Sequence, residues 1–256
     1  PAGNLHIQWN LYHTPDAFQI PDATVGTSDI DWINYLWVFS NPSQLGDLLA
    51  HGEETTGQDG KVSLSIQPTQ NNNEPITNQQ RLTLEVTITD DSGFTVSQRA
   101  TAYLHPDSVY LGIRPDTWTG QSGKEMGFTI VSVGWDKLPV ATNNLVAEFQ
   151  KVKWVEDQTA TQTDFGVPRF KPEYTPVAST NFATDATGQA RLAFTPPDPG
   201  TYQIEVKSGK ALSLMILWVS GPGQAIWPNL PNQHLKLTPD ASSYTPGDTA
   251  QVFIPN

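Results

Sequence analysis

Apolar and polar residues alternate with a period of two along much of this chain, which is typical of strands that bury one face. Residues 5–11, 62–66 and 82–89 show this alternation. The third run leads into an Asp-Asp-Ser-Gly turn at 90–93, so residues 94–104 are predicted to return as its antiparallel partner. Further strands are predicted at 128–133, 146–154, 190–194, 202–206 and 212–219.

The segments between these runs are rich in Pro, Gly, Asn and Asp, the residues that supply turn dihedral angles. The 21 prolines would break most long helices, and no segment predicts a helix longer than about two turns. Many short antiparallel strands without the spacing of strand–helix–strand units indicate an all-β fold of tandem antiparallel β-sandwich domains, of the immunoglobulin or fibronectin type.

An internal repeat supports more than one domain. Residues 56–64 resemble residues 184–192, and in both a polar turn that ends in Gly precedes an alternating strand. We therefore expect one sandwich at 1–108 that lacks its opening strands and a complete sandwich at 109–220. A Pro- and Gly-rich connector at 221–234 and the first strands of a third, truncated domain at 235–256 follow. The four residues 105–108 predict a short junction, and we expect the strands at 235–256 to pair with an open sheet edge.

Composition narrows the function classes. The net charge of −12 argues against a nucleic-acid partner, because such a surface would not neutralise phosphates. The absence of cysteine excludes disulfides, a cysteine nucleophile and a thioester within these residues. The longest apolar run, 214–219, is too short to span a bilayer, so no membrane contact is expected from this segment.

Residues that could carry chemistry are few and scattered. His51, Glu53 and Glu54 come nearest to a metal site, but on a glycine-flanked loop they are better interpreted as a solvated turn. Asp29 and Asp31 lack the regular loop of oxygen ligands that calcium needs. No nucleophile, phosphate-binding or dinucleotide motif is present. We therefore predict no catalytic, cofactor-binding or metal-binding residue, no cofactor, and a protein that is not an enzyme.

Aromatic residues form a second group of candidates. A dense stretch, made of Trp32, Tyr35, Trp37 and Phe39, could stack on sugars or on a partner chain, but core packing and contact between domains explain it more simply. Trp218 and Trp227 flank the connector and are expected to pack between adjacent domains.

Several segments resemble the bacterial alpha-2-macroglobulin family. The run Val-Tyr-Leu-Gly-Ile-Arg at 109–114 is similar to a domain opening in that family, and the stretch 184–202, with its turn Gly, Pro-Pro and Gly-x-Tyr, is similar to a later segment. Trp218-Val-Ser-Gly and Trp227 match the segment that follows. The most specific match is Leu-x-Leu-x-Pro-Asp-x-x-x-Tyr-x-Pro-Gly-Asp-Thr-Ala at 235–250, which resembles the start of the macroglobulin-like domain ahead of the bait region. The resemblance covers residues 80–256, and residues 1–79 fit by domain type.

The resemblance implies a scaffold fragment of a broad-spectrum endopeptidase inhibitor, located in the periplasm or outside the cell. In that family, cleavage of a bait segment triggers collapse of the domains around the protease. No bait residue and no thioester cysteine can be assigned here, so target proteases would be partners through the full-length parent alone. The direct partners would be neighbouring domains.

Two alternatives remain open from the residues themselves. One is an immunoglobulin-like binding module of a bacterial adhesin or carbohydrate-binding protein, with Trp37 and its neighbours as the contact. The other is an accessory domain of an exported hydrolase.

Overall fold

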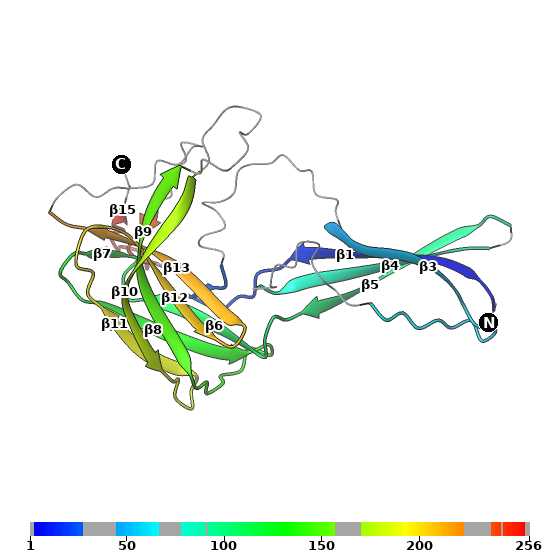
Figure 1. Ribbon diagram of the computed structural model, residues 1–256, viewed down its shortest axis with the longest axis horizontal. Helices are drawn as coiled ribbons and strands as arrows, with labels where there is room; N and C mark the ends of the chain where they lie inside the picture. The colour runs from blue at the N-terminus through cyan, green and yellow to red at the C-terminus, as the bar shows by residue number, and fades with distance from the viewer. Residues whose placement is uncertain are drawn as a thin grey trace. The chain divides into compact units, whose positions relative to one another are not determined.

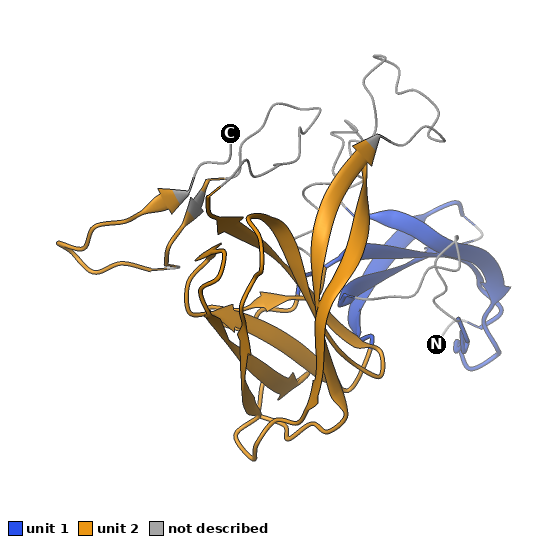
Figure 2. Ribbon diagram, turned by 60° about the vertical axis from the view of Figure 1, so that its left-hand side comes forward, with its two compact units in different colours: residues 1–17, 38–106 blue, residues 18–37, 107–256 orange. Residues whose placement is uncertain are grey.

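The computed structural model describes residues 3–27, 45–66, 78–90, 92–156, 170–222, 237–241 and 243–253. These residues form strands and turns and no helix, so the predicted all-β class is confirmed (Figure 1). The chain divides into two compact units (Figure 2). The first comprises Pro1–Ala17 and Val38–Pro106, and the second Phe18–Trp37 and Asp107–Asn256.

The first unit is built on one antiparallel sheet of four strands. Its order is β3-β1-β4-β5, with β1 at His6–Pro15, β3 at Asp47–Thr55, β4 at Gln80–Thr89 and β5 at Thr95–Leu104. The hairpin of β4 and β5 is in register over ten residue pairs. Its turn closes because the Asp90 carboxylate accepts hydrogen bonds from the amides of Ser92 and Phe94, at 2.9 and 2.8 Å.

The faces of this sheet follow the alternation of the sequence. Ile7 and Leu11 on β1 are buried, and they lie opposite Ile88 and Leu84 of β4. Polar pairs occupy the other face, where Arg99 binds Glu85 at 2.7 Å. One apolar face and one polar face are expected of a sheet that covers a core on one side.

The second unit is a sandwich of two sheets. One sheet has the order β11-β8-β6-β2 and the other β10-β9-β12-β13-β7, in which β13 and β7 are parallel and the other pairs antiparallel. Their bounds are β2 Thr24–Val25, β6 Val109–Pro115, β7 Thr119–Gln121, β8 Met126–Gly134, β9 Leu145–Glu156, β10 Phe170–Phe182, β11 Gln189–Phe194, β12 Gly200–Ser208 and β13 Ala211–Ser220.

Alternate residues of these strands meet in a continuous core between the sheets. Phe128 from one sheet and Ile204 and Leu217 from the other are fully buried. The rings of Phe149 and Phe194 stack with centroids 4.3 Å apart. Each large apolar side chain buried in this way stabilises the fold by about 1.5–3 kcal/mol, so this core positions every loop of the unit.

Residues 18–27 pack on the second unit, although the sequence interpretation placed them in a first domain at 1–108. β2 pairs with β6, and the Phe18 ring stacks on Tyr110 with centroids 3.7 Å apart. Phe18 and Ile20 are buried there with Val131 and Val133. The physical reason is that both faces of the β6–β8 pair are apolar, so one face needs a cover besides the opposing sheet. Gly112 leaves room for that cover, because a Cβ on it would lie 3.1 Å from Cδ1 of Ile20.

The expected strands hold with specific exceptions. Residues 62–66 alternate but form no strand in the described chain. β3 and β10 were not predicted, because Asp47–Thr55 lacks alternation and Phe170–Phe182 contains two prolines. Near the end of the chain, β14 (Thr238–Pro239) and β15 (Val252–Phe253) pair with each other. The expected residues 235, 236 and 254–256 of that segment lie outside the described residues.

Candidate functional site

The repeat seen in the sequence corresponds to a repeated turn. Thr56 and Thr184 are both buried, and each side-chain oxygen accepts a hydrogen bond from a distant backbone amide. The Leu5 amide donates to Thr56 at 2.9 Å, and the Thr142 amide donates to Thr184 at 2.7 Å. Each threonine amide in turn donates to the carbonyl of the same distant residue. The two threonines therefore join the start of one segment to the turn that follows another.

The turns themselves also match residue by residue. Gly57 donates its amide to the Lys61 carbonyl at 2.8 Å, and Asp185 donates to Gln189 at the same distance. A glycine with positive φ closes each turn, Gly60 at 75° and Gly188 at 71°. L-residues with a side chain rarely adopt this conformation, which explains why Gly occurs at the same point of both segments.

A tyrosine corner explains the Gly-x-Tyr part of the resemblance. The Tyr202 hydroxyl donates to the Asp198 carbonyl at 2.9 Å, and the Asp198 amide approaches the same oxygen at 3.3 Å. Burial raises the pKa of Tyr202, so its hydroxyl stays protonated and able to donate. The contact fixes the loop that precedes β12, which is the structural role such corners have in β-sandwiches.

The motif near residue 240 is likewise a set of local hydrogen bonds. Asp240 accepts from the Tyr244 hydroxyl at 2.7 Å and from the Gln251 amide at 2.9 Å. Asp248 accepts from the Thr245 amide at 2.7 Å. The hydrogen bond from Tyr244 lowers the pKa of Asp240, and the bonds from Thr245 lower that of Asp248. These residues shape a turn, and their arrangement offers no nucleophile or proton-transfer chain.

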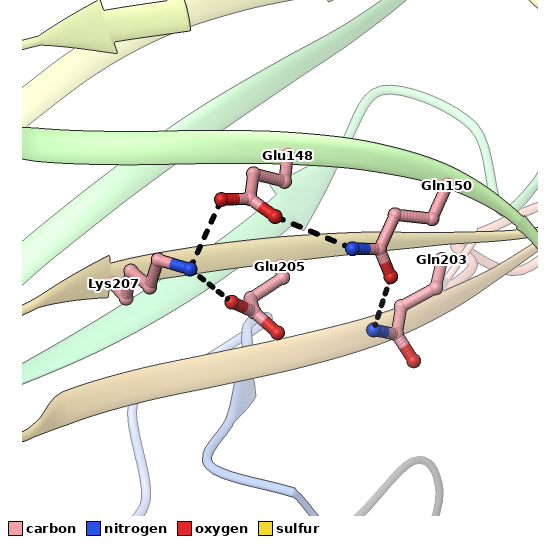
Figure 3. A network of polar contacts seen from close by, with 5 residues as sticks. All are labelled: Glu148, Gln150, Gln203, Glu205 and Lys207. Carbon is pink, nitrogen blue, oxygen red and sulfur yellow. Dashed lines mark hydrogen bonds and ion pairs between the residues drawn. The ribbon is translucent and has the colours of Figure 1, made fainter. Parts of the chain in front are cut away.

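The largest side-chain network that the structure shows lies on the outer face of β9 and β12 (Figure 3). Lys207 binds Glu148 at 3.0 Å and Glu205 at 2.8 Å. Gln150 donates to Glu148 at 3.3 Å, and Gln203 donates to Gln150 at 3.4 Å. All five side chains point to the same side of the sheet because their positions on each strand differ by two residues.

Electrostatics explain how this network is arranged. Glu205 and Glu148 are directly opposite in the strand register, a placement in which like charges repel. Lys207 offsets that repulsion, and its hydrogen bond to Glu205 and then that to Glu148 raise its pKa. An ammonium with a raised pKa is a poor base near neutral pH, so the network stabilises the sheet and is not suited to proton transfer.

His51, Glu53 and Glu54 do not form a metal site. They lie on strand β3, where the sequence interpretation expected a loop. The strand places Glu54 on the opposite face from His51 and Glu53. Glu53 is held by Gln8, which donates at 2.9 Å, and lies 3.4 Å from Nε2 of His6. In the described part of the chain, no three His, Asp or Glu side chains are placed to share a metal ion.

The other sequence candidates are only partly covered. Trp218 is buried on β13. Asp29, Asp31, the aromatic residues at 32–39 and Trp227 lie outside the described residues. Among the described residues, no helix is long and apolar enough to cross a membrane. The network of Figure 3 and the repeated threonine turn were not predicted, although the alternation of Glu148, Gln150, Gln203, Glu205 and Lys207 on two predicted strands was a signal for the former.

Comparison with known proteins defines the class first. No family model matches the chain. Among solved structures, the native conformation of Escherichia coli alpha-2-macroglobulin matches with a TM-score of 0.51 and 20% identity, over 99% of this chain and 16% of that chain. Salmonella alpha-2-macroglobulin reacted with methylamine matches with a TM-score of 0.52 and 18% identity, over the same shares of the two chains. The chain therefore has the fold of macroglobulin-like β-sandwich domains.

A sequence match adds the family. An alpha-2-macroglobulin homolog from Nostoc sp. is 22% identical over 227 residues, which is 86% of this chain and 11% of that protein. Together with the structural matches, this confirms the resemblance to bacterial alpha-2-macroglobulins. The chain spans about a tenth of the length of the curated relative that it matches.

Proposed function

We propose that this chain is a structural part of a bacterial protease inhibitor of the alpha-2-macroglobulin type, and that it carries neither the bait segment nor the thioester of the trap. The observation that supports this most directly is the extent of the match. Nearly the whole chain, 99%, aligns with the solved E. coli and Salmonella proteins, while it spans 16% of each. A segment that corresponds to sandwich domains in a much longer chain contributes geometry more than chemistry.

The contacts within the chain support a mechanical role. The buried turns around Thr56 and Thr184, the tyrosine corner at Tyr202 and the Lys207 network each tie strands or loops of a sandwich together. None brings a nucleophile beside a base. The cysteine-free sequence excludes a thioester within these residues. The direct partners of the chain would be neighbouring domains of the parent, which would be located in the periplasm or outside the cell.

The function of the parent can be tested by the size of substrate that a bound protease still cleaves. A solved E. coli relative is described as trypsin-activated alpha-2-macroglobulin, so trypsin is a suitable probe. The full-length protein that contains this chain should protect a large protein substrate from trypsin while a small peptide ester is still cleaved, because a cage excludes by size. The 256-residue chain alone should do neither and should hydrolyse no ester, peptide or glycoside.

Two results would contradict the proposal. Unchanged cleavage of the large substrate by trypsin in the presence of the full-length protein would show that the parent is not a trap. Protease inhibition by the isolated chain would show that the chain itself holds an inhibitory site. The alternative of a carbohydrate-binding module is based on residues outside the described ones, and reproducible binding on a glycan array would favour it.

A further inference from the structure

The outer edge of β5 is a long row of backbone groups that the described structure leaves unpaired. The Asp90 amide donates to the Phe94 carbonyl at 3.0 Å, so these two residues form a hydrogen-bonded pair. Such pairs alternate along an antiparallel ladder, and the β4–β5 register has no irregularity. The even-numbered residues of β5 therefore bond to β4. Thr95, Ser97, Arg99, Thr101 and Tyr103 direct their N–H and C=O groups away from the sheet.

This edge is exposed and lacks the devices that normally protect a strand edge. Residues 95–103 are all exposed, and the apolar side chains of Val96 and Tyr103 are 54% and 56% exposed. β5 contains no proline, no bulge and one charged residue, Arg99, whose charge is offset by Glu85 at 2.7 Å. Exposed edges of this length otherwise carry charges, prolines or bulges that prevent pairing.

Two other edges in the same chain do carry such devices. β3, at the opposite edge of the same sheet, bears Asp47, Glu53 and Glu54 and has an irregular register beside Leu11. β10, an edge strand of the second unit, contains Pro172 and Pro176 and a bulge after Pro176. The contrast indicates that β5 is kept free to pair.

We propose that the edge of β5 is a strand-addition surface and that it pairs antiparallel with β5 of a second copy of this chain. Two registers bring nine residues of each strand into the pair. Centring on Arg99 would place that residue opposite its own copy, and like charges directly opposite are unfavourable. Centring on Ala100 instead places Arg99 opposite Thr101 of the second copy.

The register centred on Ala100 also matches both faces of the sheet. Val96 faces Leu104 of the second copy, and Ser97 faces Tyr103, so apolar residues meet apolar ones and the hydroxyl groups share the other face. The outward N–H and C=O groups of Arg99 and Thr101 form one of the hydrogen-bonded pairs. Two four-stranded sheets would then become one continuous sheet of eight strands, which removes the exposed edge from each copy.

A proline substitution tests whether the edge pairs. Thr101→Pro removes an outward N–H and leaves the bonds from β5 to β4 intact, so the fold should persist. By the same alternation, the Thr56 amide bond to Leu5 makes the N–H of His51 point outward from β3, so His51→Pro is a matched control on the protected edge. At an ionic strength of about 0.15 M, sedimentation velocity should show a dimer for the wild type and for His51→Pro. Thr101→Pro should be a monomer with an unchanged circular dichroism spectrum.

A single cysteine tests the register, since the natural chain has none. Residues directly opposite in a non-hydrogen-bonded pair have Cα atoms about 4.5 Å apart, within disulfide range. Ala100→Cys should therefore form a disulfide-linked dimer on oxidation. Gln98→Cys lies on the same strand and face, and it should not, because its own copy would be four residues away along the strand.

Each alternative outcome overturns the proposal. A monomeric wild type at every concentration, or a dimer unaffected by Thr101→Pro, would show that β5 does not mediate pairing between copies. A dimer that is lost in Thr101→Pro but gives no cross-link through Ala100→Cys would mean that β5 pairs with a different strand, such as β15. Preferential cross-linking of Gln98→Cys would show a different register.

Discussion

The indole of Trp9 lies directly over Gly52, the residue opposite it on the neighbouring strand β3. The two are partners in the β1–β3 register, and a Cβ on Gly52 would lie 2.6 Å from Cζ2 of the indole. The missing side chain of Gly52 is therefore the space that the Trp9 ring occupies. An aromatic ring that covers a glycine across two strands pins the register of β1 against β3.

We expect Gly52→Ala to lower the free energy of unfolding by about 1–3 kcal/mol, because the added methyl group must displace the ring or the strand. Urea unfolding followed by circular dichroism measures this change. In a Trp9→Val background the same substitution should cost much less, since the clash has gone. Equal losses in the two backgrounds would show that the ring does not cause the effect.

Ser213→Ala should loosen the attachment of residues 18–27 to the second unit. Ser213 is fully buried, and its hydroxyl accepts from the Gly26 amide at 2.9 Å and donates to the Leu111 carbonyl at 2.5 Å. The variant leaves the buried Gly26 amide without its acceptor, a loss of about 1–3 kcal/mol. Hydrogen exchange should accelerate at residues 18–27 before it does in the core. Ser179→Ala, on an exposed part of β10, is the control and should change neither measurement.

Lys207→Met should destabilise the second unit by about 0.5–1 kcal/mol, because the Lys207 side chain is 43% exposed and solvent screens its ion pairs. The loss arises from the repulsion between Glu205 and Glu148 that the ammonium no longer offsets. Adding Glu205→Gln should recover most of it, and 1 M salt should shrink it. If the double variant is no more stable than Lys207→Met alone, the repulsion account is wrong.

The stability of the chain should fall in acid partly through Asp185. The Thr187 hydroxyl and then the Gln189 amide donate to this carboxylate and lower its pKa below 3.8. Because the folded carboxyl has the lower pKa, the unfolded state binds more protons between the two values. The stabilisation is therefore complete above pH 3.8 and is lost as the pH falls through the folded value.

Removal of the main cause tests that account. Thr187→Ala should move the pKa of Asp185 up towards 3.8 in an NMR titration. Asp185→Asn, which keeps an acceptor oxygen but does not titrate, should flatten the acid side of the curve of urea midpoint against pH. An unchanged Asp185 titration in Thr187→Ala would contradict the assigned cause.

The sequence by itself determined the parts that depend on local chemistry. The β4–β5 hairpin could be predicted because residues 82–104 alternate on both sides of a turn whose Asp90 caps its own amides. The family resemblance was readable near residue 240 because Asp240, Tyr244 and Asp248 each form hydrogen bonds within a few residues.

The tertiary structure alone decided the parts that depend on a distant partner. Asp47–Thr55 becomes a strand because β1 supplies its ladder, and Phe170–Phe182 because β9 does. Residues 62–66 have the alternation of a strand but no described neighbour to pair with. Phe18 is apolar in any context, but the sequence does not show that its ring stacks on Tyr110. Alternation states which face of a segment is apolar. The surface that covers this face depends on packing between residues nearly a hundred positions apart.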